Sequence, residues 1–205
     1  MATDGGPQHT PLFIGCLLTG VIFAPFNPSF DDDETRHVLG FLRPRVLIAE
    51  KSKPLYERLT PLVVSYDEVD AWFSDSSVED ADPEVEEAPA LDSPAIILCS
   101  SGTTGYPKGV EVSHRSLLQL VAIATDQRML MWLEGSFLLP TPAFWISVTM
   151  LLLMSINAGK KVLLMGKFDE QLFLKVLREH QVFISNCTVD CDGCYSPKLQ
   201  SAQDG

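Results

Sequence analysis

The chain has 205 residues, of which 46% are hydrophobic and 20% are charged. This apolar share is enough for one substantial core, and it excludes a disordered chain, a collagen-like repeat and a disulfide-rich mini-protein. The net charge is −12, but 11 of the 27 acidic residues lie between Asp67 and Asp92, in a stretch without Lys or Arg. The remaining sequence is close to neutral and offers no basic face, so we expect no nucleic-acid partner.

Taken in order, the first part of the chain alternates short apolar runs with helical patterns. Acidic residues at 31–34 favour a helix N-terminus, with apolar positions following at helical spacing. A second, short helix is predicted at Leu55–Leu59. The predicted strands are Val21–Ala24, Arg45–Ala49 and Leu62–Ser65. The acidic segment from about 74 to 93 has no apolar period and is predicted to be a solvated connector.

After this connector, Ala95–Cys99 is fully apolar and fits a strand buried on both faces. Further strands are predicted at Val110–Val112, Phe137–Leu139 and Val162–Met165, with helices at Ser116–Ala124, Phe144–Asn157 and Glu170–His180. The pattern ends after about Ile184 in an irregular tail. Alternating strands and helices with short links predict an α/β fold with a mainly parallel sheet.

Two long uncharged runs, at 11–30 and 135–159, are each long enough to span a bilayer. The first holds three prolines and no basic residue precedes it, which is atypical of a signal peptide. The helical part of the second, after Pro142, is short for a span and normal for a buried helix. We therefore expect no membrane span, although a membrane-inserted protein is the third alternative for this chain.

The five cysteines divide into two groups. Cys16 and Cys99 lie inside apolar runs and are interpreted as buried small hydrophobic residues. A C-x3-C-x2-C pattern near the C-terminus could hold zinc if His180 or Asp192 supplied a fourth ligand; its members are Cys187, Cys191 and Cys194. The odd number of cysteines argues against a secreted disulfide framework, and we predict no metal site.

One loop combines residue types that are suited to binding a ligand. Residues 100–109 read SSGTTGYPKG and follow the predicted buried strand directly. Two glycines permit a sharp turn, four hydroxyl groups add donors, and Lys108 adds a cation, which together suit a polyphosphate. The P-loop of NTPases is excluded, because Gly102 and Gly105 are too close and Gly109 follows the lysine. An ordinary Ser/Thr/Gly turn is the alternative, but such turns rarely combine all these residues.

The sequence SSGTTGYPKGV resembles the phosphate-binding signature of the adenylate-forming (AMP-binding) superfamily, which includes acyl-CoA synthetases, 4-coumarate–CoA ligases and luciferases. Three flanking segments agree: GCLLTGVIFAPFNPSF at 15–30, VSHRSLL at 112–118 and AGKKVLLMGKFDEQLFLKVLREHQV at 158–182. The last is most like the luciferase and coumarate-ligase branch. The resemblance runs from about Leu12 to Val182.

This resemblance implies an incomplete, doubly wound α/β domain at 11–184, taken from the large N-terminal domain of such an enzyme, with an irregular tail at 185–205. It also implies conversion of a carboxylic acid and ATP to an acyl-adenylate, followed by transfer of the acyl group to CoA. Magnesium would bridge the phosphates. The residues that would bind the phosphates are Ser100, Ser101, Gly102, Thr103, Thr104, Gly105 and Lys108.

The sequence departs from the family where luciferases and coumarate ligases place a histidine near the substrate. Phe144 and Trp145 occupy that place here. They are interpreted either as two core aromatic residues or as an aromatic wall that favours a fatty or aryl acid over luciferin. His114 and Arg115 match family positions, and we interpret them as structural.

Three family segments are missing from the sequence: Tyr-Gly-x-Thr-Glu for adenine and magnesium, Thr-Gly-Asp for ribose, and the C-terminal catalytic lysine segment. The chain therefore looks like a truncated piece of a larger ligase that is inactive alone, and no catalytic residue can be named. The alternative is a non-catalytic product that binds nucleotide weakly or associates with a full-length relative. Relatives are often peroxisomal, but this chain ends in Gln-Asp-Gly, so we expect a cytoplasmic location for it as written.

Overall fold

The computed structural model describes residues 1–75, 88–100, 105–124, 135–166, 168–180 and 182–185. The helices of this part are α1 (His9–Thr19), α2 (Asp32–Leu42), α3 (Pro54–Leu59), α4 (Tyr66–Ser74), α5 (His114–Ala124), α7 (Ile146–Asn157) and α8 (Glu170–Glu179). The strands are β1 (Val46–Ala49), β2 (Leu62–Ser65), β3 (Pro94–Ser100), β4 (Lys108–Ser113), β5 (Ser136–Leu139), β6 (Val162–Leu164) and β7 (Val182–Ser185).

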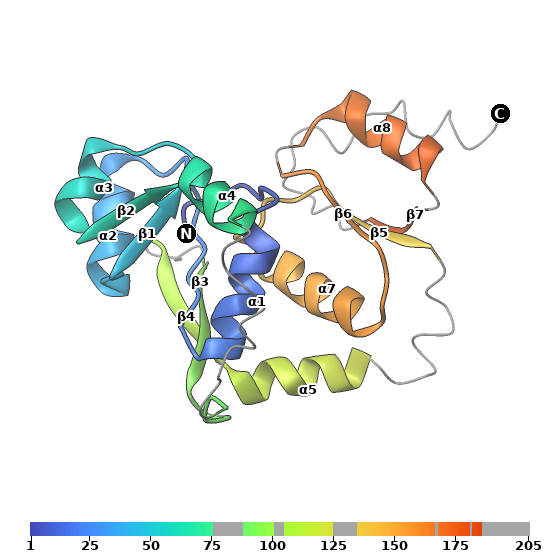
Figure 1. The fold of residues 1–205 in the computed structure, drawn as a ribbon, viewed down its shortest axis with the longest axis horizontal. Coiled ribbons are helices and arrows are strands. Elements are labelled where there is room, and N and C mark those ends of the chain that lie inside the picture. The colour runs from blue at the N-terminus through green and yellow to red at the C-terminus, as the bar shows by residue number, and fades with distance from the viewer. Residues whose placement is uncertain (76–87, 101–104, 125–134, 167, 181, 186–205) are drawn as a thin grey trace.

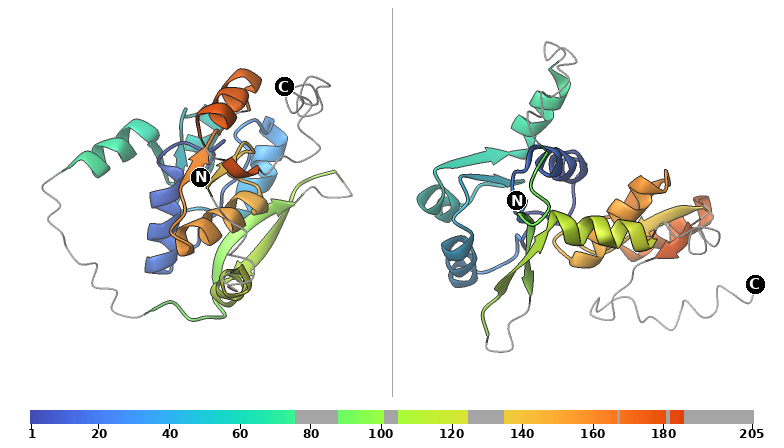
Figure 2. Two further views of the ribbon diagram at one scale, coloured as in Figure 1. Left: turned by 90° about the vertical axis from the view of Figure 1, so that its right-hand side faces the viewer. Right: turned by 90° about the horizontal axis from the view of Figure 1, so that it is seen from below.

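The strands form three small sheets (Figure 1). β1 pairs with β2 in parallel, and β5 lies between β6 and β7, again in parallel. β3 and β4 form an antiparallel hairpin. Helices α1 and α7 lie between the two parallel sheets, and the hairpin and α5 lie below them in the view of Figure 1. Figure 2 shows α5 and α7 side by side. The predicted α/β class and the predominance of parallel pairs are confirmed. The strands of the described residues are nevertheless divided among three sheets, where one sheet was expected.

The sheet of β1 and β2 is covered by helix α2, whose start the acidic residues predicted correctly. The Asp31 carboxylate accepts hydrogen bonds from the backbone of Asp33 and Glu34, and the Glu34 carboxylate accepts one from the Asp31 amide in return. This capping box satisfies backbone donors that the first helical turn leaves free. The buried face of α2, with Val38 and Leu39, packs into a cluster with strand β1.

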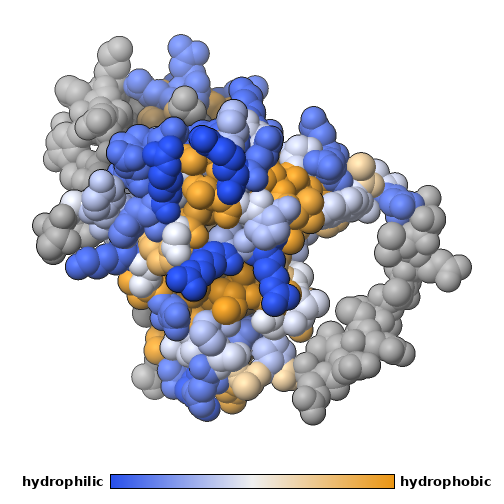
Figure 3. Space-filling view, turned by 90° about the vertical axis from the view of Figure 1, so that its left-hand side faces the viewer, coloured by the Kyte–Doolittle hydropathy of each residue, from blue (hydrophilic) through white to orange (hydrophobic). Residues whose placement is uncertain are grey.

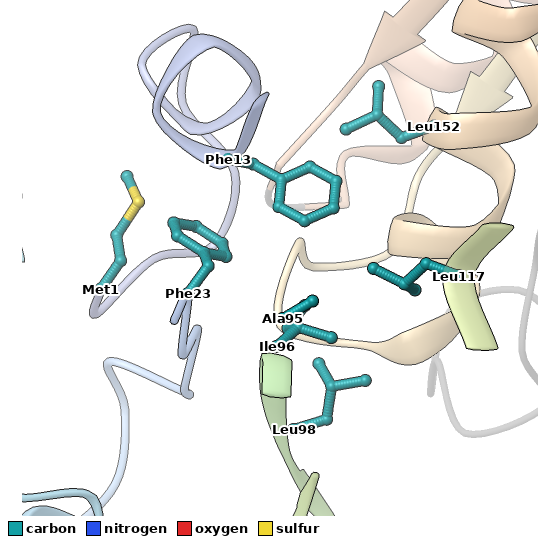
Figure 4. Close-up of a cluster of buried hydrophobic side chains, with 8 residues drawn as sticks. All are labelled: Met1, Phe13, Phe23, Ala95, Ile96, Leu98, Leu117 and Leu152. Carbon is teal, nitrogen blue, oxygen red and sulfur yellow. The ribbon is translucent and has the colours of Figure 1, made fainter. Parts of the chain in front are cut away.

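The central core joins α1 to β3, α5 and α7. Figure 4 shows its buried side chains, which are Met1, Phe13, Phe23, Ala95, Ile96, Leu98, Leu117 and Leu152. The strand predicted at Val21–Ala24 is wrong, because only Phe23 pairs, in an isolated bridge with Ile96. Val21 and Ile22 are exposed, and Pro25 lacks the N–H that would continue a ladder.

Three elements, α1, α4 and β7, have no counterpart among the predicted helix and strand ranges. Helix α4 follows β2 directly and has its own capping box, in which the Ser65 hydroxyl accepts from the Glu68 amide and Glu68 accepts from the Ser65 amide. It ends at Ser74, where the acidic connector was expected to begin. Most of that connector, 76–87, lies outside the described residues, as does nearly all of the tail. Strand β7 pairs with β5 just before that tail.

No helix among the described residues combines the length and the apolar character needed to cross a membrane. The helix in the second uncharged run, α7, has 12 residues. Apolar surface is nevertheless exposed: Figure 3 views the molecule from the side of α2 and α3 and shows hydrophobic patches between charged side chains. Phe41, Val46 and Leu62, from α2, β1 and β2, are between 39% and 52% exposed.

The two cysteines of the described part are free thiols and only partly buried. Cys16 packs against the central core, and Cys99 packs against the cluster beneath α2. Burial raises the pKa of both thiols, to about 11 for Cys99. Both therefore stay protonated near neutral pH and behave as small apolar side chains, but they are less buried than the sequence interpretation expected. The other three cysteines lie outside the described residues.

Candidate functional site

The hydroxyl-rich loop joins the two strands of the β3–β4 hairpin. Ser100, the last residue of β3, pairs with Lys108, the first residue of β4. The Ser100 hydroxyl also donates a hydrogen bond to the Lys108 carbonyl oxygen at 3.5 Å. The two ends of the loop are thereby held together at the tip of the hairpin. Of the predicted phosphate-binding residues, 101–104 lie outside the described residues.

The described end of the loop is built for a close approach to a ligand. Gly105 has φ of 113°, a backbone conformation that L side chains rarely adopt. The Lys108 side chain is exposed, and its ammonium makes no salt bridge within the part of the chain that the structure describes. An exposed ammonium on the residue that pairs with Ser100, together with a nearby glycine turn, is able to bind an anion such as phosphate.

A pocket of about 190 Å³ opens beside this loop. We call it the loop pocket; its lining residues are Asn27, Phe30, Glu34, Cys99, Ser100, Gly105, Pro107, Phe144 and Trp145. Phe144 is half-buried and Trp145 is 40% exposed, with ring centroids 5.9 Å apart. The structure therefore brings the predicted aromatic pair to the predicted phosphate loop, although some 40 residues separate them in sequence.

Sequence reasoning missed three lining residues of the loop pocket, all from the segment before and at the start of α2. They are Asn27, Phe30 and Glu34. The Asn27 side-chain oxygen accepts from the Ser29 amide, and the Glu34 carboxylate accepts from the Asp31 amide, so both polar groups are fixed by local turns. The Asn-Pro turn at 27–28 was visible in the sequence, but nothing there related it to the loop.

Helix α5 begins at His114 and Arg115, immediately after β4. The Arg115 guanidinium donates to both carboxylate oxygens of Asp92, at 2.7 and 3.0 Å, and its backbone amide donates to the Leu91 carbonyl. Hydrogen bonding to Arg115 lowers the pKa of Asp92. The His114 amide donates to the Ser93 carbonyl. These contacts tie the end of the acidic segment to α5 and support the structural interpretation of both residues.

Metal-ligating side chains do not gather anywhere in the described residues: no group of three His, Cys, Asp or Glu is placed to hold an ion. The C-x3-C-x2-C cysteines lie outside that part, so their zinc alternative is not addressed by the structure.

Comparison with known proteins identifies relatives of the whole described region. The sequence model of the family "AMP-binding enzyme" matches residues 2–190. The curated protein 4-coumarate–CoA ligase 3 of Arabidopsis thaliana is 31% identical over 188 residues, covering 84% of this chain and 33% of the ligase. The chain spans about a third of the length of the curated relatives it matches.

Solved structures of low sequence identity share the fold. The o-succinylbenzoate–CoA synthetase of Bacillus subtilis in complex with AMP superposes with a TM-score of 0.70 at 21% identity, covering 89% of this chain and 37% of the synthetase. The same enzyme in complex with ATP and magnesium gives a TM-score of 0.68 at 19% identity, covering 90% of this chain and 48% of the synthetase.

Proposed function

The chain belongs to the AMP-binding enzyme family, and we propose that its hydroxyl-rich loop serves the ATP-dependent activation of a carboxylic acid. The acid and ATP would give an acyl-adenylate and pyrophosphate, and the acyl group would then pass to the thiol of CoA. Because the chain spans a third of its relatives, the two chemical steps are proposed for the complete enzyme and binding of the ATP phosphates is proposed for this chain.

One juxtaposition supports this proposal most directly: polar loop residues and aromatic side chains share the loop pocket. Ser100 and Gly105 line it together with Phe144 and Trp145. Activation of a carboxylic acid requires a polyphosphate and an organic acid to meet in one place. A pocket that joins a hydroxyl and a glycine turn to aromatic side chains, next to the strand that begins at Lys108, suits that pair of substrates.

In this proposal the loop holds the β- and γ-phosphates of ATP. The Lys108 ammonium and the Ser100 hydroxyl supply charge-assisted hydrogen bonds to the phosphate oxygens, and the turn at Gly105 lets the backbone approach them. By resemblance to the family, residues 101–104 complete the cradle. A triphosphate held in this way leaves its α-phosphorus directed at the loop pocket, where a bound carboxylate is placed for in-line attack.

The donor set fits a magnesium-bound nucleotide. Mg²⁺ prefers oxygen ligands and usually takes them from substrate phosphates and water with few protein groups. The described loop ends offer the Ser100 hydroxyl and the Lys108 ammonium to the phosphates, so the ion would take its oxygen ligands from the nucleotide and water. When bound, the ion would neutralise charge on the phosphates and make them better leaving groups.

For the acid, we propose a fatty or aryl carboxylate. Three aromatic side chains, Phe30, Phe144 and Trp145, line the loop pocket. The Cys99 thiol adds no charge to it, and the Glu34 carboxylate, which also lines it, accepts a hydrogen bond from the Asp31 amide. An apolar acyl group buried against these rings gains about 25 cal/mol for each Å² of apolar surface removed from water. The binding energy therefore depends on the apolar area of the acid.

Binding tests with the chain itself examine the proposal. We expect ATP to bind in calorimetry and inorganic tripolyphosphate to compete with it, while adenosine competes poorly, because the loop recognises phosphates. Competition by adenosine equal to that by tripolyphosphate would contradict this assignment.

Carboxylate-dependent exchange of pyrophosphate into ATP separates catalysis from binding. We expect this chain to bind ATP without supporting exchange, because its sequence holds no Tyr-Gly-x-Thr-Glu, Thr-Gly-Asp or catalytic lysine segment. Exchange by the chain alone would show that the adenylation step needs fewer groups than proposed.

A further inference from the structure

One face of helix α2 lies against the C-terminal end of the hydroxyl-rich loop. His37 and Phe41 are one helical turn apart and therefore share that face. The imidazole N–H of His37 at Nε2 donates to the Pro107 carbonyl oxygen at 3.0 Å. Its ring also stacks on Tyr106, with centroids 5.0 Å apart and an interplanar angle of 28°. The end of the β3–β4 hairpin at which β4 begins is seen beside α2 in Figure 1.

Phe41 contacts the chain on the other side of Lys108. A Cβ atom added at Gly109 would lie 2.7 Å from Cε2 of Phe41, so the ring rests against the glycine backbone. Phe41 also meets the His37 ring edge to face, with centroids 5.7 Å apart. The two residues that flank Lys108, Pro107 and Gly109, are thus both in contact with one pair of side chains on α2.

The pair of side chains is itself anchored. The capping box at the start of α2 fixes the first turn, and Val38 and Leu39, between His37 and Phe41 in sequence, are 0% and 3% exposed. A helix held in this way is a rigid support, and ordering a functional group on a rigid support lowers the entropy lost on binding.

We propose that His37 and Phe41 position Lys108 for the phosphates of the nucleotide by bracing the backbone on both sides of it. The inference rests on the proposed function, from which the nucleotide ligand is taken. It adds a role for α2, a helix that lies outside the loop sequence. Lys108 supplies the charge, while His37 acts through Pro107 and Tyr106 and is a positioning residue. Without the brace, Lys108 samples more conformations, and the nucleotide must order it on binding.

The contact of His37 and Phe41 with the loop can be tested without nucleotide, from the rate at which trypsin cleaves after Lys108. The measured quantity is the cleavage rate after Lys108 relative to that after the exposed Lys175, followed by mass spectrometry in wild type and variants. His37→Ala removes the ring contacts with Tyr106 and Phe41 and the hydrogen bond to Pro107, and is expected to raise the relative rate by about three- to tenfold. The matched control is Arg36→Ala, which removes the neighbouring exposed side chain of α2 and its contact with Asp33, and it should stay within about twofold of wild type.

Titration with ATP and with tripolyphosphate then measures the consequence. We expect His37→Ala to bind both ligands about three- to tenfold more weakly, His37→Gln to recover part of the affinity through its side-chain N–H, and Arg36→Ala to bind like wild type. Because His37 is exposed, the thermal midpoint should change little.

Three outcomes of these experiments would contradict the proposal or a part of it. Equal relative cleavage in His37→Ala and wild type overturns the brace, whatever the ligand does. Faster cleavage with unchanged tripolyphosphate affinity overturns its role in positioning Lys108. A wild-type chain that binds neither ligand overturns the proposed function and this positioning role with it, while the cleavage assay still reports whether α2 holds the loop.

Discussion

Ser100 and Lys108 are the last residue pair of the β3–β4 ladder, and the Ser100 hydroxyl lies 3.5 Å from the Lys108 carbonyl oxygen. The pairing brings a hydroxyl and an ammonium to the mouth of one loop, next to a pocket whose other wall is aromatic. A single antiparallel hairpin thus places one of the proposed phosphate ligands at each end of the loop, and His37 of helix α2 contacts Pro107 at the end that carries the lysine.

Replacing Ser100 with Ala should weaken tripolyphosphate binding by about three- to tenfold, because one hydrogen bond to a charged oxygen is lost. The exposed hydroxyl contributes only a long hydrogen bond to the fold, so the thermal midpoint should hardly change. Calorimetric titration measures the affinity. Ser29→Ala, at another exposed serine, is the control; an equal loss in both variants would contradict a direct role for Ser100.

Gly109→Ala should destabilise the protein by about 1–3 kcal/mol, because the new methyl group would meet the Phe41 ring at 2.7 Å. Phe41→Ala in the same chain should relieve most of this cost, which a double-mutant cycle in urea unfolding detects. The matched control is Gly40→Ala inside α2, where an added Cβ meets nothing within 4 Å. That variant should gain about 0.5–1 kcal/mol from helix propensity. Equal destabilisation by both variants would disprove the close contact.

The stability of the chain should fall as the pH is lowered from about 6.5 towards 4. His9 is 1% exposed between the rings of Phe13 and Phe23, and its Nδ1 has no partner among the described residues. Burial, with a smaller contribution from the nearby amino terminus, lowers the His9 pKa to about 4. His9 therefore binds a proton less tightly in the folded chain than in the unfolded chain. Acid consequently favours unfolding, and protonation of His9 lowers the free energy of unfolding by about 3 kcal/mol at the acid end of this pH range.

Comparison of wild type with His9→Leu isolates this effect. Burial also lowers the pKa of the Met1 amino group, to about 5, which acts in the same direction in both proteins. The free energy of unfolding in urea, measured at pH 7 and pH 4.5, should therefore depend less on pH in the variant. Parallel pH profiles for the two proteins would show that His9 is not the responsible group.

Trp145→Ala should weaken binding of an aryl or fatty carboxylate to the chain while leaving tripolyphosphate affinity unchanged. The indole lines the loop pocket, whose lining does not include Lys108, and offers apolar contact area for an acyl group. Equilibrium dialysis with a radiolabelled aryl acid and with a fatty acid of similar size measures both cases. Trp72→Ala, at an exposed tryptophan of α4, is the control. If Trp145→Ala binds the carboxylic acid as tightly as wild type, Phe144 and Trp145 have no role in substrate binding and are core residues only.

Local patterns in the sequence predicted many elements correctly. The acidic capping residues before α2, the bounds of β2, and the strand that precedes the loop all follow from short-range signals. Helix α4 was missed although Ser65 and Glu68 form a recognisable capping box, because the acidic composition after it dominated the interpretation. The apolar run of β3 was assigned to a parallel sheet, since apolar runs carry no information on the direction of the partner strand.

The chemistry of the site was partly visible as well. Its hydroxyls, glycines and lysine are contiguous in sequence, so the loop could be recognised from sequence alone. The supports of the loop could not, because His37 and Phe41 reach it only through the packing of α2 against the hairpin. The same holds for Asn27 and Phe30, which line the loop pocket through tertiary contacts without a local sequence signature.

The most direct test of the account is the ATP affinity of Lys108→Ala beside wild type and Lys161→Ala, measured by calorimetry at one magnesium and salt concentration. Lys161 is an exposed lysine outside the loop, and its backbone carbonyl accepts a hydrogen bond from the Phe137 amide of β5. Replacing its side chain removes one positive charge and therefore serves as the control for loss of charge. Loss of a charge-assisted hydrogen bond predicts an affinity about ten- to a hundredfold lower for Lys108→Ala and unchanged for Lys161→Ala. Equal affinity of Lys108→Ala and wild type would contradict the central claim that this loop binds the phosphates of ATP.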